Sequence, residues 1–200
     1  MTTPRPLQVV VDCDPGIDDA VALALLAEAE EVELLGVTTV SGNVGVEDST
    51  RNAARVMHLV GRGEVPIAAG ASRPLVRDTP PYPPIHGVNG LGEVELPACP
   101  SEDGAEPALD LLAAILRAAE PASVTLVALA PLTNLALLLA LHPELTDRID
   151  RVLTMAASLD RGNVTPYAEF NVWADPEAAH RVLVESGLPL QVFPLAATKL

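Results

Sequence analysis

The sequence predicts an α/β fold: an open, mostly parallel sheet with helices on both faces. Short runs rich in Val, Leu and Thr alternate with longer runs whose apolar residues recur at helical spacing along all 200 residues. Aromatic residues make up only 2% of a chain that is 49% hydrophobic, which favours helices packed on an aliphatic sheet over an aromatic-cored sandwich. The composition predicts a folded chain, and the length predicts a single domain over residues 1–200.

The first half of the chain contains two strand–loop–helix units and a third strand. The strands are β-branched or Leu-rich runs, and the first helix repeats its apolar residues at Ala20, Leu23, Ala24 and Ala27. A Ser-Gly-Asn break separates the second strand from the second helix. These elements are predicted at residues 7–12, 18–29, 32–40, 46–60 and 66–69, in the order strand, helix, strand, helix, strand.

A long irregular segment rich in proline and glycine is predicted at residues 70–106, and a loop of this length is typically a binding or lid segment, or else disordered. Regular elements then resume at residues 108–119, 123–129, 132–141, 151–155, 176–185 and 190–195, starting with a helix and alternating with strands. Strands that alternate with helices in this way pair in parallel through right-handed crossovers.

The chain is strongly acidic, since 12 Lys and Arg residues against 27 Asp and Glu residues give a formal net charge of −15. We therefore expect no nucleic-acid partner, because phosphate binding requires a basic face, whereas excess carboxylates suit a cation. The absence of a membrane-length apolar stretch and of a signal-peptide pattern predicts no membrane partner and a cytoplasmic location. Cys13 and Cys99 are expected to be two buried thiols rather than a disulfide framework or zinc site.

Four carboxylates lie directly after the first predicted strand, at Asp12, Asp14, Asp18 and Asp19. Asp18 and Asp19 alone could be capping residues of the next helix. Adding Asp12 and Asp14 in the same turn would raise the pKa of each carboxyl unless a cation neutralised them. Ligation by oxygen atoms alone favours Ca²⁺ or Mg²⁺ over zinc. An aspartyl-phosphatase motif is the weaker alternative, because it requires Thr where this chain has Gly16.

Other polar residues follow the later strands, and the carboxyl ends of parallel strands gather at one edge of the sheet. These residues are Asn43, Asn134, Asn163, Glu169 and Asn171. Asn residues in loops also stabilise turns, and Asn134 is expected to begin or cap the following helix without a catalytic role. A lone loop histidine such as His86 is more often solvated than functional.

Seven short motifs follow one another over almost the whole chain. They are DCDPGIDDA at residues 12–20, TTVSGN at 38–43, HGVNGLG at 86–92, PLTNLA at 131–136, GNVTP at 162–166, AEFN at 168–171 and DPEAA at 175–179. Together and in this order they resemble the inosine-uridine preferring nucleoside hydrolases. The resemblance implies that family's nucleoside hydrolase-like, Rossmann-like fold.

The resemblance also implies a glycosidase that hydrolyses the N-glycosidic bond of purine and pyrimidine ribonucleosides to free base and ribose, with one Ca²⁺. The implied metal ligands are Asp12 (as a ligand or as support), Asp14, Asp19 and the backbone carbonyl of Leu129, with Asp14 also the general base for a calcium-bound water. The implied substrate-binding residues are Asp18, Asn43, Met155, Asn163, Glu169 and Asn171. His86 is the implied catalytic residue near the base, and a homodimer or homotetramer is the implied assembly.

Three departures from the family pattern leave a second interpretation open, one of which is Ala196, where the family usually has Asp. Family members continue past the position of Leu200 into a segment with a His-Asp pair, so we expect the C-terminal part of the family fold to be absent. Residues 155–158 read Met-Ala-Ala-Ser where the family has a Met-Gly-Gly turn, and added Cβ atoms are unfavourable where glycine permits unusual φ. The alternative to an active hydrolase is therefore a catalytically inactive, truncated remnant that binds Ca²⁺ and ribose.

Overall fold

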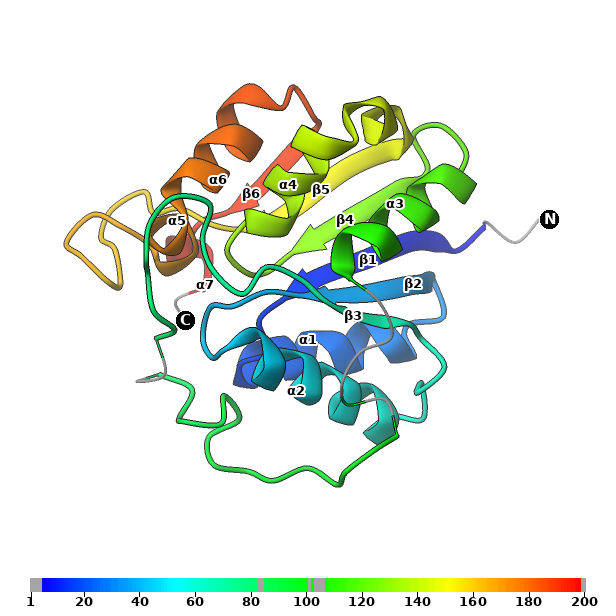
Figure 1. The fold of residues 1–200 in the computed structure, drawn as a ribbon, viewed down its shortest axis with the longest axis horizontal. Helices are drawn as coiled ribbons and strands as arrows, with labels where there is room; N and C mark the ends of the chain where they lie inside the picture. The colour runs from blue at the N-terminus through cyan, green and yellow to red at the C-terminus, as the bar shows by residue number, and fades with distance from the viewer. Residues whose placement is uncertain (1–4, 83–84, 101, 103–106, 199–200) are drawn as a thin grey trace.

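The computed structural model describes residues 5–82, 85–100, 102 and 107–198. Its centre is one six-stranded sheet in the order β3-β2-β1-β4-β5-β6, with every neighbouring pair parallel (Figure 1). The strands are β1 (Leu7–Cys13), β2 (Val32–Thr39), β3 (Ile67–Ala69), β4 (Val124–Ala128), β5 (Ile149–Met155) and β6 (Leu190–Phe193). The predicted parallel α/β architecture is confirmed.

Helices cover both faces of this sheet (Figure 1). On one face lie α1 (Ile17–Glu28) and α2 (Val46–Leu59), and on the other lie α3 (Ala108–Ala118), α4 (Thr133–Leu141) and α6 (Pro176–His180). Successive side chains of a strand point to opposite faces, so Val10 joins the buried cluster with α3 and α4, whereas Val9 and Val11 join the cluster with α1 and α2. Within the described part of the chain, no helix has the length and apolar character needed to cross a membrane.

The order of the strands reverses beside β1, because β2 and β3 lie on one side of it and β4 to β6 on the other. Ligands of open α/β sheets bind at the carboxyl ends of the strands at such a switch point. Asp12 of β1 pairs in register with Ala128 of β4, and the Leu129 N–H donates to the Asp12 carbonyl at 2.8 Å. The turn after β1 and the loop after β4 are therefore neighbours.

The elements after residue 140 depart most from the sequence prediction. The helices α5 (Phe170–Ala174) and α7 (Leu195–Thr198) and a 3-10 helix at Pro143–Arg148 were not predicted, because each is shorter than a helical repeat pattern can reveal. The helix predicted at 176–185 is α6 followed by a π-helical turn at Arg181–Glu185. The strand predicted at 190–195 ends at Phe193, where Pro194 cannot donate to the sheet.

The long irregular segment is confirmed for its described part, which forms no helix or strand between Ala69 and Ala108; residues 83–84, 101 and 103–106 lie outside the described residues. The segment is tied to α6 at two points. The Leu75 N–H donates to Asp175 Oδ2 at 2.9 Å, and Arg77 pairs with Glu177 at 2.9 Å. Both thiols were expected to be buried. Cys13 is buried, whereas Cys99, which lies in this irregular segment, is only partly buried.

Candidate active site

Asp12 lies near the end of β1 and is 2% exposed. Its Oδ1 atom accepts hydrogen bonds from Thr38 Oγ1 at 2.6 Å and from Asn134 Nδ2 at 2.7 Å. Its Oδ2 atom is also buried, and the described residues offer it no hydrogen-bond partner. Burial raises the pKa of Asp12 to about 6 against the lowering effect of the two donors. A buried carboxylate oxygen without a donor is costly unless positive charge lies near it.

Asp14 lies in the turn after β1, against the loop that follows β2. The Asn43 N–H donates to Asp14 Oδ2 at 2.6 Å, and Asn43 Nδ2 donates to the Asp14 carbonyl at 3.2 Å. Glycine is required at position 42, because a Cβ atom there would lie 2.0 Å from Asp14 Oδ2. The two loops therefore meet as the sequence predicted, and their backbones fix the Asp14 side chain.

Asp19, in the first turn of α1, faces Asp14. The Asp14 N–H donates to Asp19 Oδ2 at 3.2 Å. Burial and the charge of Asp19 raise the pKa of Asp14 well above its usual range, and burial together with neighbouring Asp18 raises the pKa of Asp19 to about 7. The Asp18 side chain is 78% exposed, so the fourth carboxylate of the turn is not part of the buried group.

The buried carboxylates Asp12, Asp14 and Asp19 fit a cation. None of the ion pairs formed by the described residues reaches them, so protein cations leave their charge uncompensated there. Within the same described ranges, no group of three or more His, Cys, Asp or Glu side chains could hold a metal ion by itself. A cation would therefore also need a backbone oxygen or water, and a hard cation accepts such oxygen ligands.

The opposite wall of the site comes from α5 and the ends of β4 and β5. Glu169 caps α5: it accepts hydrogen bonds from the N–H groups of Asn171 at 2.7 Å and Val172 at 3.2 Å, and also from Ala157 at 3.0 Å. Burial raises the pKa of Glu169. The three donors hold Glu169 in place and leave less of its carboxylate available to a ligand than the sequence suggested. Asn171 Nδ2 donates to the carbonyls of Leu129 and Met155, both at 2.9 Å.

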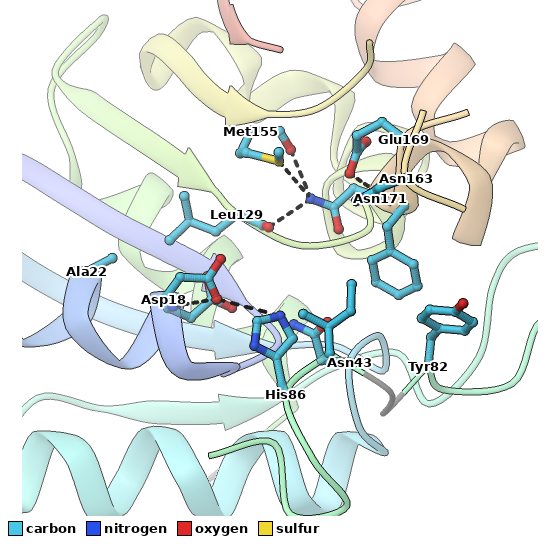
Figure 2. A pocket seen from close by; sticks show the side chains of 13 residues that line it. Asp18, Ala22, Asn43, Tyr82, His86, Leu129, Met155, Asn163, Glu169 and Asn171 are labelled. Carbon is cyan, nitrogen blue, oxygen red and sulfur yellow. Dashed lines mark hydrogen bonds and ion pairs between the residues drawn. The ribbon is translucent and has the colours of Figure 1, made fainter. Parts of the chain in front are cut away.

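These walls enclose a cavity of about 200 Å³ (Figure 2). All the predicted site residues line it except Asp12 and Asp14, which are buried. The predicted residues that line the cavity are Asp18, Asp19, Asn43, His86, Leu129, Met155, Asn163, Glu169 and Asn171. Residues from four loops, from the starts of α1 and α5 and from the end of β5 thus meet at one edge of the sheet.

His86 lies between the aspartate turn and the cavity. The Ile17 N–H donates to His86 Nδ1 at 3.3 Å, and His86 Nε2 lies 3.8 Å from Asp18 Oδ1, with the two side chains facing each other in Figure 2. The first bond requires Nδ1 to be unprotonated, so a neutral His86 carries its proton on Nε2. His86 is therefore held by the fold, not solvated in a free loop.

Sequence reasoning missed two groups of residues. Tyr82 and Phe170 line the cavity, and with Trp173 they form an aromatic cluster with ring centroids 5.9 to 6.4 Å apart. The sequence did contain a signal for this cluster. The chain has only five aromatic residues, and two of them, Phe170 and Trp173, lie close to the predicted site residue Asn171 in the sequence. Asn134, which was given no role at the site, donates to Asp12 across 122 positions of sequence.

Buried carboxylates beside a cavity at the switch point of a parallel sheet are the arrangement of an α/β protein with a small-molecule site. Residues 9–200 match the family described as inosine-uridine preferring nucleoside hydrolase. This chain belongs to that family, so the family expected from its sequence is confirmed.

Individual relatives agree with this assignment. The chain is 44% identical over 191 residues to the pyrimidine-specific ribonucleoside hydrolase RihA of Photobacterium profundum, covering 95% of this chain and 61% of that protein. It is 44% identical over 183 residues to the inosine-uridine preferring nucleoside hydrolase of Leishmania major, covering 90% and 58%. A purine-preferring ribonucleoside hydrolase from Gardnerella vaginalis has a similar structure, with a TM-score of 0.85 and 34% identity over 94% of this chain and 60% of that one. The chain thus spans about three fifths of the relatives' length.

Proposed function

We propose that this chain hydrolyses the N-glycosidic bond of ribonucleosides to free base and ribose with the help of Ca²⁺. The observation that carries the proposal is the buried, uncompensated carboxylate group beside a cavity lined by amide and carboxylate side chains. The relatives are named for pyrimidine, purine and inosine-uridine substrates. Cleavage of a ribonucleoside is the chemistry that these names share.

The cation site of this proposal consists of Asp14, Asp19 and the Leu129 carbonyl, with Asp12 as support behind them. Ca²⁺ bound there would supply an oriented water of lowered pKa. Asp14 would take the proton from that water, because its buried carboxylate belongs to the proposed cation site beside Asp19. The Asn43 N–H would keep the Asp14 carboxylate in position during this transfer.

The sugar would bind to polar side chains, some of which are free to contact it and others of which are held by hydrogen bonds within the protein. Asp18, whose carboxylate is exposed, and the amides of Asn43, Asn163 and Asn171 would contact ribose hydroxyls. Met155 would provide an apolar contact. Cleavage leaves positive charge at the anomeric carbon, and carboxylate and amide oxygens around the sugar stabilise that charge. Glu169 would act in part by fixing the start of α5.

His86 would lie near the base, because it lines the cavity from the long irregular segment. Its bond from Ile17 leaves the Nε2 proton, in the neutral ring, available to a hydrogen-bond acceptor. Nε2 also lies near Asp18. In this arrangement His86 would contact the base and the neighbouring Asp18 would contact the ribose.

The test is release of base and reducing sugar from inosine and uridine in the presence of Ca²⁺. Asp14→Asn should lower the rate by about 10²–10⁴-fold, the usual contribution of a general base. Asp150→Asn is the matched control, since Asp150 lies at the opposite end of β5 and pairs with Arg151. Calorimetric Ca²⁺ binding without product release from any nucleoside would favour the alternative, a chain that binds Ca²⁺ and ribose without catalysis. Absence of both would refute the cation site.

A further inference from the structure

We propose that Asn171 is a positioning residue that fixes the Leu129 carbonyl for the cation site. This inference rests on the proposed function, because the cation is the one assigned there. Sequence resemblance implied only sugar binding for this residue. The structure adds a second task, since the same amide contacts the backbone oxygen that the cation site requires (Figure 2).

The Asn171 amide is committed to backbone carbonyls of two neighbouring strands. Its Nδ2 atom donates to the carbonyl of Leu129, just after β4, at 2.9 Å and to the carbonyl of Met155, the last residue of β5, at 2.9 Å. An amide nitrogen has two protons, so both are used. The Oδ1 atom remains, and in Figure 2 it points toward the cavity.

The backbone of Asn171 is fixed as firmly as its side chain. The Asn171 N–H donates to Glu169 Oε1 at 2.7 Å in the cap of α5, and the residue is 5% exposed. A buried side chain on a capped helix start has little rotational freedom. The amide can therefore act as a rigid brace between α5 and the two strands.

Leu129 needs such a brace because its carbonyl lies beyond the last residue of β4. The Leu129 N–H donates to the Asp12 carbonyl at 2.8 Å, which ties the nitrogen side of the residue to β1. The Asn171 amide ties the oxygen side. A carbonyl oxygen has two lone pairs, so one donor from Asn171 leaves the second lone pair for a cation. Groups that orient metal ligands in this way typically contribute 10–100-fold to metal affinity.

The proposal predicts that Asn171→Leu and Asn171→Ala weaken Ca²⁺ binding by at least about tenfold, measured by calorimetry on protein first stripped with EDTA. Asn171→Leu keeps the shape of the side chain and removes both donors. Asn163→Leu is the matched control, because Asn163 lines the same cavity but is exposed and, within the described residues, forms no hydrogen bond with Leu129. Its Ca²⁺ affinity should equal that of the wild type.

Measuring ribose affinity at saturating Ca²⁺ distinguishes a residue that positions the Leu129 carbonyl from one that only contacts the sugar. If Asn171 only contacts sugar, its variants will lose ribose affinity and keep wild-type Ca²⁺ affinity, which would overturn the inference and leave the proposed function standing. If the wild type itself fails to bind Ca²⁺, the proposed cation site fails together with the inference.

A second measurement needs no variant and so does not depend on whether the variants fold. In wild-type protein, the side-chain amide signals of Asn171 in a ¹⁵N–¹H spectrum should shift on Ca²⁺ addition, because their acceptor would become a metal ligand. Signals of Asn171 that stay in place while the protein binds Ca²⁺ would overturn the proposal.

Discussion

Without a bound cation, replacing Asp12 with asparagine is expected to stabilise the protein increasingly as the pH rises. The pKa of Asp12 is about 6 in the folded protein, against an ordinary value of 3.8. Between these values the folded state binds more protons than the unfolded state, so the free energy of unfolding of the wild type falls as the pH rises through this window. The fully charged group costs ~3 kcal/mol, since one pKa unit corresponds to about 1.4 kcal/mol.

Urea denaturation in EDTA between about pH 4 and pH 8 measures this effect. Asp12→Asn keeps an oxygen that accepts from Thr38 and Asn134 but carries no charge. The free energy of unfolding of the variant minus that of the wild type should grow by roughly 2–3 kcal/mol over this range. The same difference for Asp150→Asn should stay nearly constant. A constant or opposite trend for Asp12→Asn would refute the view that Asp12 is a buried charge without compensation. Saturating Ca²⁺ should reduce the variant's advantage, because a ligand of the folded state stabilises the wild type.

Two further substitutions test the supports of the site. Ala157 has a φ of +67°, a conformation that strains an L-residue other than glycine by roughly 1–2 kcal/mol. Ala157→Gly should therefore raise the free energy of unfolding by up to about 1 kcal/mol, because the higher entropy of glycine in the unfolded chain offsets part of the relieved strain. Ala156→Gly, at a buried position outside the left-handed region, should lower it by about 1 kcal/mol; equal effects of both glycines would contradict the strain. Asp175→Ala should destabilise by about 2–3 kcal/mol, because it removes the cap of α6 and the acceptor for Thr133 and Leu75. Thermal and urea denaturation measure both changes, and a loss below about 0.5 kcal/mol for Asp175→Ala would show that water replaces its contacts.

The architecture could be predicted from the sequence because it depends on local patterns. β-branched runs such as 7–12 and helical apolar spacing in 18–29 are properties of neighbouring residues. Their alternation then requires a parallel sheet, and a parallel sheet gathers the polar ends of its strands at one edge. Asp14 and Asn43 could therefore be placed at the same edge of the sheet from the sequence pattern, whereas Leu129 was implied only by the family resemblance.

The sequence alone also determined the chemical character of the site, because the crowding of Asp12, Asp14 and Asp19 is visible in one short turn. Only the tertiary structure decided which of these charges are buried, that Asn134 holds Asp12, and that Asn171 holds the Leu129 carbonyl. The physical reason is that burial and hydrogen bonding between distant residues depend on strand register and side-chain rotamers. Neither quantity is encoded in the spacing of residues along the chain.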